Sequence, residues 1–567
     1  MYRRLTKSIL LFLARFSPVL FIVGPAFFAK GYLFFTDFVW GPHSAAISGW
    51  ATSAFLASVA IKALSFVLSV DVIEKLYIAV CLGLVLWGGR KIAGLFLKNQ
   101  WLVFIASLFA LFNPFVYDRA MYGQFGIVAA FGLMLVGAGF LLEYLLEHLE
   151  KKQWRQIVFA GLAFAFSIQC SQHFIFFIAA FYIFVFLPGL FIGKRETVED
   201  GGNDKVGAKA KIIAALKISA ILLVIAFVLN ANWLVGGVTG TSALGQFVST
   251  GITQQDLVAF QTSGKTGADA LGNVLMMSGF WGKDQFRYAD LTTFANNWGR
   301  SFFLLLPLIL WGFFVGLRSK EKKYRAMTIG AGTLFAVSII LAAGIRIPVG
   351  SQITYFLFNH LPFYKGLRES QKWVSVATMI YLIFLSVGLR EFFATKIVQR
   401  NALIMKILVG AIIVMQAPLL LWGFGGQVKS VQYPSDWYTV NGYIVHDDAG
   451  CSGSILFFPW HEYMSFSWIG AIIANPAPSF FQCPVISGTD MEWGGNIIGA
   501  SEDPEGQAVV AWLNAGGKTD LLQNSAYNIK YIVLAKELDW QSYIGMGTNP
   551  QLQPVMETAT LVVYKVK

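Results

Sequence analysis

Apolar blocks about twenty residues long recur from residue 9 to about residue 425, and they constrain the fold more than any other feature of the chain. A helix needs about 20 mostly apolar residues to cross the hydrocarbon core of a bilayer. Only 13% of the 567 residues are charged, against about 25% in soluble globular proteins. The sequence therefore predicts a polytopic α-helical membrane protein with about eleven transmembrane helices, near 9–29, 76–92, 101–117, 126–147, 157–171, 174–192, 216–235, 301–317, 326–345, 373–389 and 404–424.

The composition changes near residue 426 to that of an ordinary globular domain. Strand-like runs at 454–458, 508–512, 531–535 and 560–565 predict a small α/β domain in 426–567, after a transmembrane domain in 1–425. Cys451 and Cys483 both lie in this part and could form a disulfide if it is exported. Because the spacing does not show whether their Cα atoms approach within about 7 Å, the alternative of two free thiols stays open.

Basic residues are concentrated in alternate loops, as in the segment 318–325. This positive-inside pattern predicts a multi-pass plasma-membrane protein with a cytoplasmic N-terminus and, for an odd number of spans, an extracytoplasmic C-terminal domain. The pattern also accounts for the net charge of +12 without a nucleic-acid partner. We interpret the N-terminal apolar run as a retained first span rather than a cleaved signal peptide.

Two segments need separate interpretations. Residues 51–70 are apolar, but counting them as a span would reverse every later loop, so we expect an interfacial or re-entrant helix with Lys62 reaching toward water. The segment 201–211 (GGNDKVGAKAK) has the composition of a flexible cytoplasmic linker.

Polar residues near the outer ends of the predicted spans are candidates for function, because such groups are costly at a membrane. Asp37 is the only acidic residue between Met1 and Asp71 and lies among aromatic residues. It could act as a general base whose pKa is set by a semi-buried aromatic site, or it could cap a helix or solvate a loop.

The second outer turn, 112–124, carries Asp118, Arg119 and Gln124 between two apolar runs. Asp118 and Arg119 could simply close the turn, or Arg119 could bind a phosphate that Asp118 helps to orient. His173, in another short outer turn, is either a packing histidine or a contact for phosphate or sugar.

The loop before the tenth predicted span carries Lys365, Arg368, Glu369 and Lys372. Cations at an outer face run against the positive-inside bias, and arginine and lysine are well suited to phosphate. The alternative is interfacial anchoring to lipid headgroups. A weaker signal comes from the outer loop 236–300, where carboxylates and aromatic residues that suit sugar binding or an interfacial loop are mixed with one arginine: Asp256, Asp269, Asp284, Asp290, Trp281, Trp298 and Arg287.

Three motifs together resemble the GT-C superfamily, the multi-span glycosyltransferases that use polyprenyl-phosphate sugars. They are Thr36-Asp37, the 113–124 turn with Asn113-Pro114, and the loop from Phe363-Tyr364 to Lys372-Trp373. The nearest resemblance is to large bacterial and archaeal membrane proteins of the arabinofuranosyltransferase-D-like kind. Runs at 456–460, 475–478 and 529–534 are similar to segments of their exported domains.

The resemblance implies transfer of a sugar from a lipid-linked donor to an extracytoplasmic glycan or protein acceptor. It implies Asp37 as the catalytic base and a set of donor-phosphate ligands with supporting polar residues: Arg119, Arg368, Lys365, Lys372 and His173, supported by Asp118, Glu369 and Gln124.

The first loop has no Asp-x-Asp and the soluble part no Trp-Trp-Asp, which argues against an oligosaccharyltransferase. We expect no obligatory cofactor and assign no metal ligands, although a divalent metal stays possible. The main alternative is a non-catalytic binding or scaffold protein for lipid-linked glycans in cell-envelope assembly. A transporter ranks last, because the chain shows no paired Gly/Pro-broken spans in matching halves.

Overall fold

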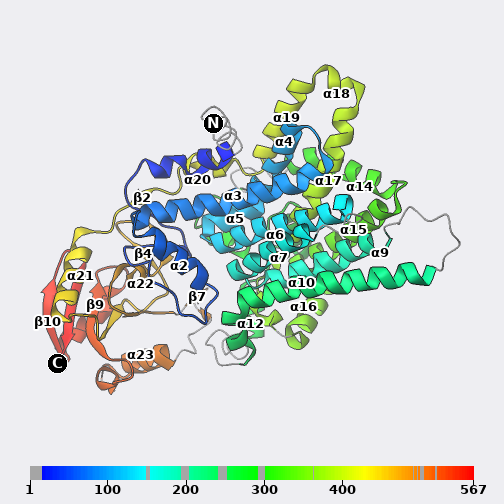
Figure 1. Cartoon of the computed structure of the whole chain (residues 1–567). Helices are drawn as coiled ribbons and strands as arrows, with labels where there is room; N and C mark the ends of the chain where they lie inside the picture. The colour runs from blue at the N-terminus through cyan, green and yellow to red at the C-terminus, as the bar shows by residue number, and fades with distance from the viewer. Residues whose placement is uncertain are drawn as a thin grey trace.

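The structure is a computed structural model that describes residues 16–148, 154–192, 204–239, 252–291, 301–361, 363–489, 491–493, 496–498, 504–517 and 520–567. A helical bundle occupies one side of the molecule and a strand-containing domain the other (Figure 1). Among the described residues, every strand except β1 (Tyr32–Leu33) follows the last helix of the bundle, α20 (Leu421–Gly425). A sheet-containing C-terminal domain is therefore present, as the sequence predicts.

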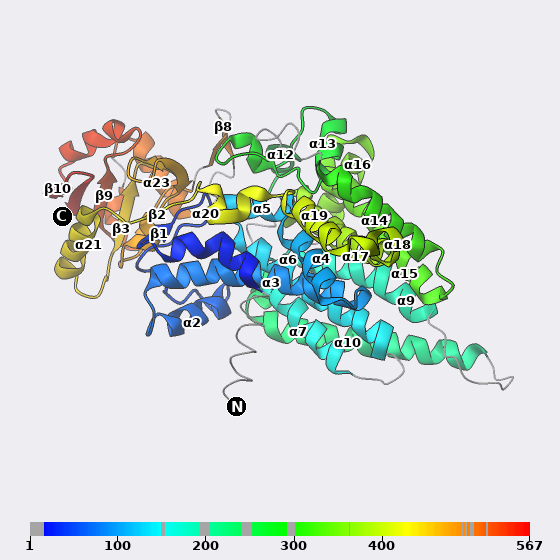
Figure 2. The ribbon, with the colours of Figure 1, turned by 90° about the horizontal axis from the view of Figure 1, so that it is seen from above.

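The bundle contains long helices and shorter ones that connect them (Figure 2). The long helices are α3 (Val70–Phe96), α6 (Phe125–Glu143), α7 (Arg155–Cys170), α10 (Asp204–Val238), α14 (Phe302–Leu317), α15 (Lys322–Ala343) and α17 (Val374–Ala394). The shorter ones are α2 (Phe55–Leu64), α4 (Gln100–Leu111), α5 (Pro114–Tyr122), α8 (Phe174–Phe181), α9 (Leu187–Ile192), α12 (Gln254–Ala259), α13 (Gly267–Leu275), α16 (Pro348–His360), α18 (Lys396–Arg400) and α19 (Ala402–Val414).

Within the described residues, five helical segments are long and apolar enough to cross a membrane, or up to seven if each of two bent pairs is one span. The five coincide with the predicted spans near 126–147, 174–192, 216–235, 326–345 and 373–389. The predicted total of about eleven is not confirmed.

The predicted span 101–117 is not a straight helix but a pair, α4 and α5, bent by 49°. Pro114 has no N–H to continue the first helix, and the Asn113 side chain accepts a hydrogen bond from the Val116 N–H to start the second. The span 404–424 is likewise broken after α19, with a bend of 76°. The first break sets the direction of the turn that carries Arg119 and Gln124.

Two sequence predictions are wrong. The linker predicted at 201–211 is helical from Asp204 onward, where α10 begins; Ala and Lys in this stretch are good helix formers, and 201–203 lie outside the described residues. The strand predicted at 508–512 is part of α23 (Pro504–Asn514). Its buried residues Val509 and Trp512 are three apart, which is a helical spacing.

The apolar segment 51–70 contains α2, whose ten residues extend about 15 Å and cannot cross a bilayer. Its exposed apolar side chains include Leu56, Val59 and Leu64. That this helix lies at the membrane surface stays a prediction.

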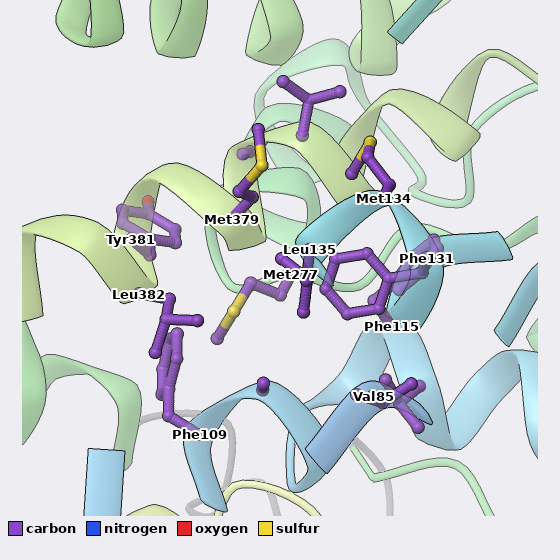
Figure 3. Close-up of a cluster of buried hydrophobic side chains, with 14 of the residues drawn as sticks. Val85, Phe109, Phe115, Phe131, Met134, Leu135, Met277, Met379, Tyr381 and Leu382 are labelled. Carbon is purple, nitrogen blue, oxygen red and sulfur yellow. The ribbon is translucent and has the colours of Figure 1, made fainter. Parts of the chain in front are cut away.

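The core of the bundle lies where α3, α4, α5, α6 and α17 meet. Figure 3 shows Val85, Phe109, Phe131 and Leu382 converging there from four different helices. Elsewhere, α14 and α17 approach so closely that a Cβ on Gly312 would collide with the Phe384 carbonyl oxygen.

The C-terminal domain is built on a five-stranded mixed sheet in the order β10-β11-β9-β3-β6. Its strands are β3 (Ser454–Phe458), β6 (Val485–Ile486), β9 (Ile529–Ala535), β10 (Leu552–Glu557) and β11 (Leu561–Val566), and the flanking elements are β4 (Tyr463–Phe466), β5 (Ala471–Ala474), β7 (Met491–Trp493), β8 (Asn496–Ile498), α21 (Ser435–Asp447) and α22 (Ala477–Phe480). Three of the four predicted strands are thus confirmed. Cys451 and Cys483 form a disulfide, with Cα atoms 4.8 Å apart.

The first loop of the chain is part of this domain as well as of the bundle. Strand β1 pairs with β2 (Ser430–Val431). Tyr32 and Phe34 pack in the core of the C-terminal domain against Tyr433. The next residues of the loop, including Asp37, are therefore held between the two parts of the molecule.

Candidate functional site

Asp37 lies at the junction of the bundle and the C-terminal domain. Its carboxylate accepts two hydrogen bonds, one on Oδ2 from the Gln124 side-chain amide at 3.1 Å and one on Oδ1 from the Tyr463 hydroxyl at 2.9 Å. Its backbone N–H donates to the Tyr122 carbonyl at 2.8 Å. The residue is accessible to solvent although protein surrounds it closely. The site thus offers an accessible carboxylate in a fixed orientation.

Aromatic packing and one glycine hold the Asp37 loop against the bundle. Phe35 packs on Phe125 with ring centroids 5.0 Å apart. Gly123 ends α5 in the left-handed region, at φ 91°, and a Cβ there would lie 2.7 Å from the Phe38 nitrogen. Only glycine permits both this turn and this close approach, so the loop and the turn with Gln124 meet.

The surroundings of Asp37 raise the pKa of its carboxyl group to about 6. Removal from bulk water is the main cause, because it disfavours the charged form. The hydrogen bonds from Gln124 and Tyr463 oppose that effect, and so does the positive charge of Arg287. A carboxyl group with this pKa is mostly charged at neutral pH and binds a proton more readily than an ordinary aspartate.

Gln124 connects Asp37 to a buried cation. Its Oε1 accepts a hydrogen bond from Arg119 Nη1 at 2.5 Å, while the same Nη1 donates to Glu369 Oε2 at 2.5 Å. Arg119 is only 1% exposed, and its Cζ lies 4.2 Å from the centroid of the Phe280 ring. Its Nε and Nη2 are buried without a hydrogen-bond partner. The guanidinium therefore places a positive charge near Asp37, joined to it through Gln124, and keeps unused donor capacity.

The network continues from Glu369 to Lys372 and His173. Lys372 Nζ lies 2.9 Å from Glu369 Oε1 and 3.4 Å from His173 Nδ1. Burial alone would raise the pKa of Glu369, but Lys372 and Arg119 outweigh it and hold that pKa well below its usual range. His173 Nε2 is 2.7 Å from the Gly366 carbonyl, so this nitrogen carries the proton and Nδ1 faces the ammonium. Burial and the charge of Lys372 lower the pKa of His173 to about 3, so the ring is neutral.

The structure thus brings together six of the nine residues that the sequence predicts for the site: Asp37, Gln124, Arg119, Glu369, Lys372 and His173. The three others are engaged elsewhere. Arg368 forms an ion pair with Asp256 at 3.0 Å, and Lys365 lies 5.9 Å from the Phe358 ring centroid.

Asp118, the third of these residues, accepts hydrogen bonds from Ser278 and Tyr288, both at 3.3 Å. It therefore anchors the 278–288 segment instead of contacting Asp37.

Two residues at the site were not predicted for it. Tyr463, on β4, was not singled out at all, and nothing local in the sequence connects it to Asp37. Arg287 was included only in the weak signal from the outer loop. Its Cζ lies 4.9 Å from the Tyr463 ring centroid and 5.8 Å from that of Tyr122, and its Nη1 is buried without a hydrogen-bond partner.

The arrangement combines a raised-pKa carboxylate with cations on two sides of it. Arg287 approaches from the 278–288 segment and Arg119 from the bundle. This combination can accept a proton and stabilise negative charge developing nearby. Among the residues that the structure describes, no three His, Cys, Asp or Glu side chains form a group that could hold a metal ion.

Comparison with solved structures gives the fold. The cryo-EM structure of arabinofuranosyltransferase AftD from Mycobacteria matches 98% of this chain with a TM-score of 0.59 and 13% sequence identity. The class 2 structure of its R1389S mutant matches 97% of this chain with a TM-score of 0.57 and 14% identity. This chain has the GT-C fold.

The GT-C fold is matched over nearly the whole of this chain, but the chain covers only 39% and 41% of the length of these two structures. No protein-family model and no curated protein matches the sequence.

Replacing Glu369 with glutamine should strongly destabilise the protein. The change leaves Arg119 and Lys372 buried without their shared carboxylate, which costs about 3–5 kcal/mol for broken buried ion pairs. Thermal unfolding of the purified protein in detergent checks this as a fall in Tm.

The matched control is Glu557→Gln, which also removes a carboxylate 2.9 Å from a lysine, here Lys536. The Glu557 side chain is 70% exposed, and surface pairs contribute about 0–1 kcal/mol. Equal changes in Tm for the two variants would contradict the assigned role of Glu369.

Proposed function

We propose that this protein is a membrane glycosyltransferase that moves a sugar from a polyprenyl-phosphate donor to an extracytoplasmic glycan or protein acceptor. One observation carries the proposal: an accessible carboxylate, Asp37, is fixed by two hydrogen bonds next to a network of buried cations. The GT-C fold of the chain supports it.

In the proposed reaction Asp37 is the general base. An acceptor hydroxyl approaches the accessible Asp37 carboxylate and gives its proton to a free lone pair as its oxygen attacks the anomeric carbon. The bond between that carbon and the donor phosphate oxygen breaks, and the electron pair leaves with the polyprenyl phosphate. Attack from the face opposite the leaving group inverts the anomeric configuration. The proton then passes from Asp37 to solvent.

The cations divide into two groups by accessibility. Arg119 and Lys372 are 1% and 4% exposed, so we propose that they stabilise the leaving phosphate mainly through their charge, which acts strongly across a low-dielectric region. His173, neutral and half-buried, orients Lys372. Arg287 is half-buried and beside Asp37, and we propose that the accessible part of its guanidinium contacts the phosphate directly.

Asp37 and the residues around it would face the outside of the plasma membrane, with the N-terminus in the cytoplasm. The support for this orientation is the concentration of Lys and Arg in alternate loops. The domain 426–567 would then be extracytoplasmic. It would hold the acceptor, because its Tyr463 hydroxyl donates a hydrogen bond to Asp37. The two matched structures are named arabinofuranosyltransferases, so polyprenyl-phosphate arabinose is the first donor to test.

Asp37→Asn should abolish transfer while leaving donor binding intact. Asparagine keeps the shape of the side chain but cannot accept the proton, and general-base catalysis contributes about 10²–10⁴-fold. The assay measures binding and turnover of purified protein with a panel of radiolabelled polyprenyl-phosphate sugars.

Asp269→Asn is the control for this experiment, since the Asp269 carboxylate takes part in the capping box of α13 and in no contact of the site. Unchanged turnover in Asp37→Asn would refute the base assignment. Donor binding without turnover in the wild type would favour the scaffold alternative, and no binding of any donor would count against both.

Arg287→Gln should reduce turnover by about 10²-fold, the typical loss when one donor to a developing anion is removed. The loss should fall on kcat, because the negative charge on the phosphate bridge grows in the transition state. Lys265→Gln, which removes an exposed cation from the same loop, should be silent. Equal activity of the two variants would assign the phosphate contact to another residue.

A further inference from the structure

A cavity lies far from Asp37, where the ends of α14 and α17 meet the beginning of α15. Its volume is about 510 Å³, within the range of about 300–1,000 Å³ that is typical of sites for small molecules. The helices that enclose it can be followed in Figure 2. Nothing in the proposed reaction uses this cavity.

The cavity and the buried network that leads to Asp37 lie at opposite ends of the same helix, α17. Helix α17 begins at Val374, two residues after Lys372 of the buried network, and Arg390 of the cavity lies sixteen residues further on. At about 1.5 Å per residue, this separation is about 24 Å. The two are therefore separate sites near opposite faces of the bundle.

The lining of the cavity is amphipathic. Its inner wall is apolar and includes Phe96, Leu142, Val185 and Ile383. Its polar residues are two arginines, one carboxylate and three hydroxyl side chains: Arg318, Arg390, Glu321, Ser319, Tyr324 and Thr328. These polar residues, which we call the rim, combine a net positive charge with hydrogen-bond donors. The apolar wall suits a hydrocarbon chain.

The position of the cavity favours a lipid over a soluble anion. Trp311 and Phe314 line it and are 39% and 50% exposed, on a helix apolar enough to contact the membrane. The neighbouring segment 318–325 carries five basic residues. Basic pockets between transmembrane helices near the cytoplasmic face attract anionic headgroups.

We infer that this cavity binds an anionic phospholipid, with the phosphate between Arg318 and Arg390 and one acyl chain along the apolar wall. The Arg390 Nε donates to Glu391 at 2.8 Å, which steadies the guanidinium and leaves its terminal nitrogens to face the phosphate. Glu321 and Glu391 balance the charges of the two arginines, so the net attraction for a phosphodiester comes from the other basic residues of the 318–325 segment.

The test compares lipids by thermal unfolding of delipidated protein in detergent. Phosphatidylglycerol should raise the Tm of the wild type by at least about 2 °C, because a ligand of the folded state stabilises it. Phosphatidylcholine and inorganic phosphate should not. The shift should vanish in the double variant Arg318→Gln/Arg390→Gln and persist in Lys320→Gln, which removes a nearby exposed cation that does not line the cavity.

Native mass spectrometry of the wild type provides a readout that does not depend on the variants. With equimolar lipids, bound phosphatidylglycerol should outnumber bound phosphatidylcholine several-fold. Equal binding of the two lipids, an undiminished shift in the double variant, or the same shift with inorganic phosphate would each overturn the proposal. None of these outcomes bears on glycosyl transfer, so the two proposals fail separately.

Discussion

The Gln124 side chain joins two opposite charges: its amide donates to Asp37 and its carbonyl accepts from Arg119. The rest of the site depends on this one bridge. It keeps an accessible carboxylate beside a cation that is otherwise buried. Glu369 holds that cation, and Lys372 in turn pairs with Glu369. Without the bridge, Asp37 would still lie in its loop, but its orientation would no longer be tied to the charges of the bundle.

The site also depends on contact between two parts of the chain that are far apart in sequence. Strand β1 pairs with β2, and Tyr32 and Phe34 pack in the core of the C-terminal domain. These contacts bring Tyr463 to Asp37 across a separation of 426 residues. The C-terminal domain therefore helps to orient the proposed base.

Sequence alone predicts much of the bundle and part of the site, because both follow from the cost of polar groups at a membrane. Asp37, Arg119 and Glu369 stand out for that reason, and the structure unites them. Tyr463 could not be predicted as a site residue, because a tyrosine on a strand in which buried and less buried residues alternate carries no local sequence pattern that indicates function. The sequence indicates only a weak role for Arg287, because its proposed role depends on the packing of its guanidinium between Tyr122 and Tyr463.

The errors in the fold have similar causes. A run of five apolar residues such as 508–512 fits a strand or a buried helical face equally well, and only the partners of Val509 and Trp512 decide. The predicted number of spans has a related problem, because a hydropathy profile does not show the bend that Asn113 and Pro114 introduce between α4 and α5.

The central claim is that Asp37 acts as a base held by Tyr463, and the pH dependence of kcat/KM in wild type and Tyr463→Phe tests it most directly. Because only the charged carboxylate accepts a proton, wild-type activity should fall as pH drops through about 6, the pKa of Asp37. The Tyr463 hydrogen bond stabilises the charged form and lowers that pKa. Its loss should therefore move the acidic limb to higher pH while activity at high pH persists. Identical limbs in the two proteins, or no acidic limb near pH 6, would contradict the account.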